Sequence, residues 1–229
     1  MNKELIEITT LSNLFIGGMP VTFEIGGVDL ATITDYQGYP IIPASSLKGV
    51  MRRIVRDMAG ETIISEIKIA YQNYLSKMRK ENERRLEDLG QKLESERMDK
   101  MKKRFEKAYE DASAEYLFGI QGFNDTPKLI FNDLLMAKKE KNWDSIDTKT
   151  SIDITEAQMR SNPRTYRTVR PNITFQGEIL FYHMNELEGF KVSELLTHVF
   201  EKLSQGTYRL GNSGSRGYGR IQIKRVDEG

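Results

Sequence analysis

Hydrophobic and polar residues follow two different periods along this chain, and the changes of period separate predicted strands from predicted helices. Residues 3–9 alternate polar and apolar side chains, which is typical of a half-buried strand. After Ala44 and two serines, apolar residues recur every three or four positions as far as Gly60, which predicts a helix capped by serine. The same analysis predicts strands at 128–136, 173–183 and 221–226 and a second helix at 192–203.

The middle of the chain, residues 61–116, has a different composition. Charged residues of both signs alternate there with apolar residues, mostly three or four positions apart, as in amphipathic helices. One straight helix over residues 61–116 would be roughly 80 Å long, so we expect instead a break near Asn82 or Gly90 that forms a helical hairpin. We interpret its basic residues as a solvated face balanced by its own glutamates. The segment is therefore expected to form an inserted, charged helical lobe.

Residues 142–170 are polar and lack a long apolar period, which predicts a protruding hairpin or loop at about 140–172. Without this segment and the lobe, the remaining order is strand, helix, strands, helix and strand. That order predicts an α+β fold with a ferredoxin-like, RRM-like core. The core should comprise residues 1–60 and 117–229, including the hairpin.

Composition excludes several kinds of chemistry. The chain of 229 residues contains no cysteine and two histidines, His183 and His198. Disulfides, cysteine nucleophiles and thiolate metal sites are therefore excluded, we expect no zinc site, and any metal would need oxygen ligands. No apolar run is long enough to span a membrane, and the N-terminus lacks a signal-peptide pattern. We therefore expect a cytoplasmic protein with no membrane partner.

The net charge of +1 hides an uneven distribution. Residues 156–170 carry four arginines against one glutamate, and residues 206–220 carry three arginines and no acidic residue. Affinity for phosphates depends on clustered lysines and arginines rather than on net charge. Two segments therefore have the charge expected of a nucleic-acid surface.

The first candidate motif combines a glycine-rich loop with the start of the first predicted helix. Serines at a helix N-terminus leave backbone N–H groups that can meet an anion, and three basic residues follow within two turns. A phosphate would suit such a site. Alternatively, Ser45 only caps the helix and Lys48 faces solvent. The residues concerned are Gly17, Gly18, Ser45, Ser46, Lys48, Arg52 and Arg53.

The second candidate motif is a glycine-rich loop before the last predicted strand. Glycines let a backbone approach a sugar-phosphate chain closely, arginines supply charge, and Tyr218 offers a face on which a base can stack. A permissive hairpin loop without a binding role is the alternative. The motif spans residues 210–220, and its candidate RNA-binding residues are Gly214, Ser215, Arg216, Gly217 and Tyr218.

Together the two motifs resemble the RAMP superfamily, and most closely the backbone subunit of type III CRISPR effector complexes. A strand followed by IGG, an IPxSSLKGxMR helix and a terminal SGSRGYGR loop carry the resemblance. The LFG at 117–119 and the NPR at 162–164 match further segments of that subunit, and residues 23–29 look like the segment that leads to its catalytic aspartate. The lobe at 61–116 lies outside the resemblance.

The resemblance implies a function. Copies of the chain would stack into a filament along CRISPR guide RNA, both motifs would hold guide phosphates, and other type III effector subunits would be partners. The hairpin would act as a thumb that wedges between guide and target RNA. The matching catalytic aspartate is Asp29, which would cut the target RNA. The basic residues of the thumb are Arg160, Arg164, Arg167 and Arg170.

The implied cleavage agrees with the residues available. In RNA the neighbouring 2′-OH is an internal nucleophile, so one carboxylate can suffice. Asp29 would act as a general base or hold Mg²⁺ or Mn²⁺ through its oxygens. The alternative is an aspartate that only bonds the backbone of its own turn.

Three other functions stay open. A non-catalytic scaffold of the same complex would bind guide RNA while another subunit performs the chemistry. A guide-RNA-processing endonuclease of the same superfamily shares the terminal glycine-rich loop, but often uses a histidine base and lacks the SSLKG helix. A protein-interaction module dominated by the charged lobe would have no RNA role.

Overall fold

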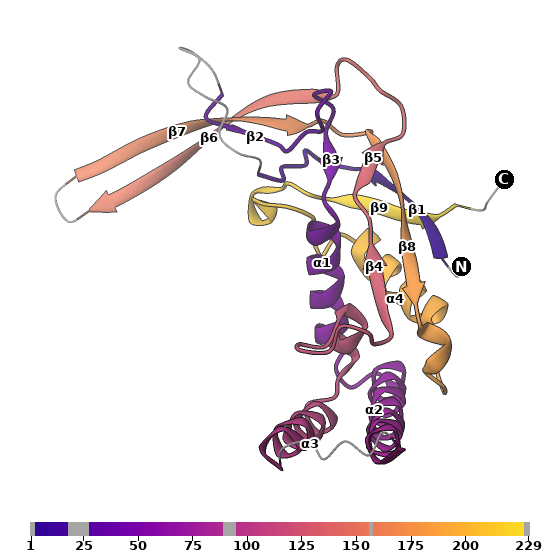
Figure 1. The fold of residues 1–229 in the computed structure, drawn as a ribbon. Helices are drawn as coiled ribbons and strands as arrows, with labels where there is room; N and C mark the ends of the chain where they lie inside the picture. Colours follow the sequence, from indigo (N-terminus) through magenta and orange to yellow (C-terminus); the bar gives the residue numbers. More distant parts are fainter. Residues whose placement is uncertain (1–2, 18–27, 89–94, 156–157, 227–229) are drawn as a thin grey trace. The chain divides into compact units, whose positions relative to one another are not determined.

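The structure is a computed structural model that describes residues 3–17, 28–88, 95–155 and 158–226. Within these residues the chain forms two β-sheets and four α-helices (Figure 1), which confirms the expected α+β class. Packing divides the chain into two compact units. Unit 1 comprises residues 1–2, 55–130 and 181–197, and unit 2 comprises residues 3–54, 131–180 and 198–229.

The larger sheet is built around its first strand, which buries Ile6, Ile8 and Thr10 on one face. The strand order is β3-β5-β8-β1-β9, and β4 also pairs with β8. Both neighbours of β1 run antiparallel to it. The strands are β1 (Lys3–Thr10), β3 (Ile41–Ile42), β4 (Lys128–Phe131), β5 (Leu134–Met136), β8 (Thr174–Tyr182) and β9 (Ile221–Arg225).

Two helices, α1 and α4, complete the order of elements in the core. α1 (Ala44–Asp57) follows β1 in the chain, and α4 (Val192–Ser204) connects β8 to β9. A strand, a helix, two strands, a helix and a strand, with β1 between the third and the last strand, is the ferredoxin-like arrangement. Both helices bury apolar residues at three- and four-residue spacing, as the sequence predicted.

The start of α1 differs from the prediction. The helix begins at Ala44, whose N–H donates to Oδ1 of Asp133 at 2.7 Å. The carbonyl of Pro43 accepts the N–H of Ser46 at 2.9 Å, so the serines lie within the first turn rather than before it. The prediction of a serine cap is wrong, because an aspartate from a distant segment bonds the first amide.

The predicted strand at 128–136 is also interrupted. β4 ends at Phe131 and β5 begins at Leu134, with Asn132 and Asp133 between them. Nδ2 of Asn132 donates to Oε1 of Glu178 at 3.1 Å, and the next residue bonds the start of α1. The strand is interrupted where Asn132 and Asp133 form side-chain hydrogen bonds, and the hydrophobic pattern alone did not predict this interruption.

The lobe is helical, as expected. α2 (Thr62–Asp88) continues through Asn82, and α3 (Ser95–Glu110) begins after residues 89–94, which lie outside the described residues together with Gly90. Tyr71 is fully buried and its hydroxyl donates to the carbonyl of Pro127 at 2.7 Å. Short 3-10 helices also occur in the chain: η1 (Ala114–Phe118), η2 (Met184–Glu186) and η3 (Gly214–Arg216).

The predicted hairpin is present in unit 2. β6 (Asp144–Thr155) and β7 (Gln158–Val169) pair along their whole length, and β2 (Leu30–Ala31) adds a short parallel strand to β7. Figure 1 shows the two long strands side by side. Among the helices of the described residues, none combines the length and the apolar content required to cross a membrane.

Candidate functional site

Backbone hydrogen bonds join the segment just before Gly17 to the terminal glycine-rich loop. The N–H of Asn212 donates to the carbonyl of Phe15 at 2.7 Å. The N–H of Gly219 donates to the carbonyl of Asn13 at 2.8 Å. The approach requires glycine, because a Cβ at Gly211 would lie 2.4 Å from the carbonyl oxygen of Phe15. Segments from opposite ends of the chain therefore form one surface.

A cavity of about 340 Å³, lined by both motifs, lies between this surface and the first turns of α1. Two arginines line it: Arg53 from α1 and Arg209 from the segment before the glycine-rich loop. Ser45 and Ser46 line it beside them, near the N-terminus of the helix. Guanidinium groups and hydroxyls around a helix N-terminus are the donors that a phosphate group needs. We refer to this site as the arginine cavity.

The arginine cavity includes only part of the predicted set. Lys48 and Arg52 do not line it, although both lie on α1. Gly17 lies beside it, since a Cβ there would be 3.4 Å from Nδ2 of Asn212. Gly18 lies outside the described residues. The sequence motifs did not single out Arg209, although the excess of arginines in residues 206–220 includes it.

The exposed part of the terminal loop follows directly on the cavity wall. Ser215, Arg216 and Gly217 are exposed, and Gly214 is partly so. Ser213 adopts a left-handed conformation with a φ of 59°, immediately before the 3-10 turn. None of these residues lines the cavity itself, so their contact with RNA stays a prediction.

Tyr218 has a different position from the one predicted. Its side chain is 4% exposed and packs with Phe15, Tyr166 and Leu30. Its hydroxyl donates to Oδ2 of Asp147 on β6. The prediction that Tyr218 stacks on a base does not fit this structure, because the ring is covered by the hairpin and by Phe15.

This aromatic cluster connects the arginine cavity to Asp29. The rings of Phe15 and Tyr166 meet edge to face, with centroids 5.2 Å apart. Leu30, which follows Asp29, packs against the same cluster and pairs with Tyr166 in the sheet. The carbonyl of Phe15 bonds the cavity wall at Asn212. The arginine cavity, the hairpin and Asp29 are therefore held together by the same aromatic cluster.

Asp29 is exposed and is fixed beside the hairpin. Its Oδ2 accepts the N–H of Thr165 at 2.6 Å, and Ala31 pairs with Arg167 two residues later. No group of three or more histidine, aspartate or glutamate side chains gathers within the described ranges. Mg²⁺ is often held by one or two carboxylates, with water and phosphate oxygens completing its coordination. Asp29 therefore fits as one oxygen ligand of such an ion.

The arginines of the hairpin differ in their surroundings. Nε of Arg167 donates to Oδ2 of Asp144 at 2.6 Å, and its guanidinium lies 5.2 Å from the ring centroid of Trp143. Arg170 donates to Oε2 of Glu140 at 2.6 Å. Arg164 is exposed, and the side chain of Arg160 lies outside the described part. Contacts within the chain thus partly offset the charge that was predicted to meet RNA at Arg167 and Arg170.

The pair formed by Tyr218 and Asp147 leads to a stability prediction. The Tyr218 hydroxyl lowers the pKa of Asp147 below its ordinary value of 3.8, and burial raises the pKa of Tyr218. Tyr218→Phe should therefore lower the free energy of unfolding by about 1 kcal/mol at pH 7. Because the pKa of Asp147 is lower in the folded than in the unfolded chain, its contribution to stability is fully present at a pH above the unfolded-state pKa. This contribution is lost as the pH falls through the folded-state pKa.

Urea unfolding at pH 7 and at pH 3 measures this effect. The native chain and Tyr218→Phe should differ in stability at the higher pH and approach each other at the lower. Tyr36→Phe is the matched control, because Tyr36 is 93% exposed, and it should change nothing. Equal stability of the native chain and Tyr218→Phe at pH 7 would contradict the predicted hydrogen bond.

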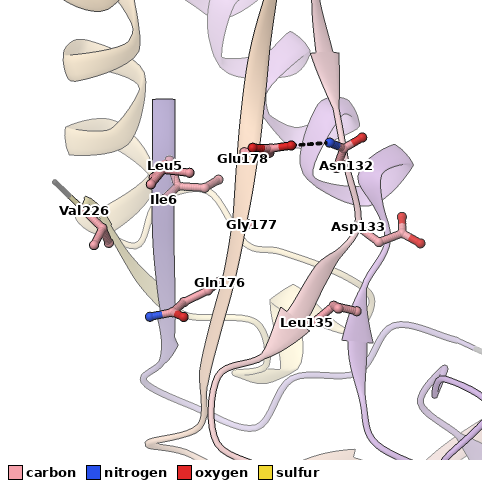
Figure 2. A pocket seen from close by; sticks show the side chains of 9 residues that line it. All are labelled: Leu5, Ile6, Asn132, Asp133, Leu135, Gln176, Gly177, Glu178 and Val226. Atoms are coloured by element: carbon pink, nitrogen blue, oxygen red, sulfur yellow. Dashed lines mark hydrogen bonds between the residues drawn. The ribbon is translucent and has the colours of Figure 1, made fainter. Parts of the chain in front are cut away.

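A second hollow, of about 420 Å³, lies beside β1, β5 and β8. Figure 2 shows Leu5, Leu135 and Val226 around it, together with the hydrogen bond between Asn132 and Glu178. RRM modules bind RNA by stacking bases on aromatic side chains of their sheet. The residues that line this hollow include two carboxylates but no aromatic or basic side chain. Its chemistry does not suit RNA, in contrast to that of the arginine cavity.

The ferredoxin-like core, the long hairpin and the glycine-rich loop at an arginine cavity define a class of protein. The family model described as the RAMP superfamily matches residues 7–222, and the chain belongs to that superfamily. It is 27% identical over 230 residues to the CRISPR system Cms endoribonuclease Csm3 of Streptococcus thermophilus, covering 96% of this chain and 86% of that protein.

The fold is also similar to that of a solved structure, the cryo-EM structure of the Type III-B Cmr-beta bound to cognate target RNA. The TM-score is 0.56 with 16% sequence identity. The match covers 98% of this chain but spans 60% of the other chain. This likeness supports the fold.

Proposed function

We propose that this chain is a guide-RNA-binding subunit of a type III CRISPR effector complex that cuts complementary target RNA through Asp29. The observation that carries the proposal is the aromatic cluster around Tyr166, which fixes the arginine cavity and Asp29 on one support. The similarity to Csm3, which is named as an endoribonuclease, agrees with this function.

Guide RNA would bind through its backbone. Arg53 and Arg209 offer forked donors that match phosphate oxygens, and Ser45 and Ser46 add hydroxyl donors. Contacts to phosphate carry no sequence information, which suits a subunit that must accept any guide. Repeated copies along one guide, together with other subunits of the complex, would extend this contact into a filament.

Target RNA would be cut beside the hairpin. The 2′-OH of the target attacks the adjacent phosphorus to form a 2′,3′-cyclic phosphate, and the 5′-oxygen leaves as a hydroxyl after it takes a proton from water. The amide of Thr165 holds one oxygen of Asp29, so the exposed carboxylate keeps one orientation from which it can accept the proton of that hydroxyl. In the alternative role, Asp29 would hold a Mg²⁺ or Mn²⁺ ion that stabilises the charge on the phosphate oxygens, and the proton would pass to water.

Cleavage by the assembled complex tests this proposal. Complex that contains the native chain should cut RNA complementary to its guide in Mg²⁺, stop when EDTA is added, and leave non-complementary RNA intact. Guide RNA should remain bound in both conditions. Continued cutting in EDTA would contradict the role of a metal ion, and absence of cutting in Mg²⁺ would favour a scaffold.

One observation favours the scaffold as the second candidate. Asp29 is not part of a cluster of three or more potential metal ligands in the residues that the structure describes. A scaffold would use the arginine cavity in the same way and leave chemistry to another subunit. The guide-processing alternative has less support, since neither His183 nor His198 lines that cavity.

A further inference from the structure

The helical lobe carries a groove that RNA binding does not explain. Its volume is about 500 Å³, and α2, α3 and residues 122–126 line it, all within unit 1. Met78 comes from α2, and Met101 and Phe105 come from α3, so the groove has an apolar lining. Methionine side chains are flexible and adapt to differently shaped apolar partners. The lining is therefore suited to accept an apolar side chain.

Positive charge stands at the edge of this groove. The guanidinium of Arg104 lies 4.7 Å from the ring centroid of Phe123. It also fills the space beside Gly122, where a Cβ would lie 2.4 Å from one of its nitrogens. Lys100 lines the groove one turn earlier on α3. Over its whole length α3 carries six basic residues against four acidic ones, so the helix has a small excess of positive charge.

An unpartnered hydroxyl lies in the same groove. Thr126 is 1% exposed and lines the groove, and its Oγ1 has no hydrogen-bond partner in the part of the chain that is described. A buried polar group without a partner is costly, and a ligand that bonds it removes that cost. The neighbouring Asp125 already accepts a hydrogen bond from the hydroxyl of Tyr182. The groove therefore offers the hydroxyl of Thr126, and its lining holds two basic side chains, Lys100 and Arg104, against the one carboxylate of Asp125.

We propose that this groove binds an acidic segment of a partner protein that presents an apolar side chain. The apolar side chain would enter among Met78, Met101 and Phe105, flanking carboxylates would meet Arg104, and a polar group of the segment would bond Thr126. RNA suits the groove less well, because Arg104 covers a face of the Phe123 ring on which a base would otherwise stack. The site is independent of the proposed RNA function.

Fluorescence anisotropy with the purified full chain tests this proposal. One probe is a labelled peptide built from glutamate and leucine, and the comparison is a peptide with lysine in place of every glutamate. The acidic peptide should bind and the basic peptide should not. Equal binding of both, or displacement of the acidic peptide from the groove by oligouridylate, would overturn the assignment to an acidic protein segment.

Variants locate the binding. Arg104→Glu should weaken binding of the acidic peptide about tenfold or more, because a charge-assisted contact is lost and a repulsion is added. Lys103→Glu is the matched control: it makes the same charge change on α3, but Lys103 is exposed and does not line the groove. If both variants lose affinity for the acidic peptide to a similar degree, the peptide is attracted by the overall charge of α3 and the groove is not its binding site.

Thr126→Val provides a second, structural readout. The variant keeps the shape of the side chain and removes a hydroxyl that makes no hydrogen bond within the described part of the chain. Its melting temperature should be equal to or above that of the native chain, while binding of the acidic peptide should fall severalfold. A drop in melting temperature of Thr126→Val with unchanged binding would contradict the role of Thr126. Melting curves of Arg104→Glu and Lys103→Glu should match that of the native chain, which excludes unfolding as the cause of lost binding.

Discussion

Complex that carries Asp29→Asn should cut target RNA about a hundredfold more slowly than native complex, while it retains its guide. Asparagine has nearly the same shape and can still accept the N–H of Thr165, which Oδ2 of Asp29 accepts at 2.6 Å. The substitution removes the negative charge and the basicity of the carboxylate. A loss of rate without a loss of structure would therefore indicate a chemical role.

Asp35→Asn is the matched control for this experiment. Oδ1 of Asp35 accepts the N–H of Gln37 at 2.8 Å and that of Tyr39 at 2.9 Å, so it too is a carboxylate that bonds backbone amides. Single-turnover cleavage and retained guide should be measured in both variants. Asp35→Asn should cut at the native rate. Native cleavage by Asp29→Asn would exclude Asp29 from the chemistry, and equal losses in both variants would indicate a general structural effect.

Reversing both charges of the arginine cavity should have the second large effect. Arg53→Glu combined with Arg209→Glu should weaken binding of guide RNA by about a hundredfold at moderate ionic strength. Affinity should also depend less steeply on salt, with a slope of log affinity against log salt reduced by about one to two. Both changes follow because two phosphate contacts are lost and two repulsions replace them.

The double variant Lys68→Glu and Lys77→Glu is the control for net charge. Both lysines are exposed on α2, and the change in total charge is the same. Filter binding of a labelled guide across a salt series should show nearly native affinity for this control. If both double variants lose affinity to the same degree, the RNA responds to overall charge and the arginine cavity is not its site.

Periodicity predicted the fold well where one face of an element is buried. The pattern at 3–9 became β1, and the apolar spacing after Ser46 became α1. It did not predict the break between β4 and β5, because Asn132 and Asp133 bond residues that are distant in sequence. The capping of α1 by Asp133 was missed for the same reason.

The candidate site was predicted in part. Glycines and serines marked both motifs, because their backbone and hydroxyl roles depend on local sequence. The side-chain direction of Tyr218 was not predictable, since its burial depends on Phe15 and on Tyr166 from the hairpin. Arg209 was recognised only as one of the arginines in the basic segment 206–220. Nothing in the sequence indicates which of these arginines lines a cavity.

Crosslinking shows directly whether guide RNA lies at the arginine cavity. Guide RNA that contains 4-thiouridine would be assembled with the native chain, irradiated, and mapped by mass spectrometry. We expect crosslinked peptides from residues 12–17, 45–53 and 209–217. Crosslinks confined to residues 132–135 and 176–178 around the second hollow, or to α3 in the lobe, would contradict it.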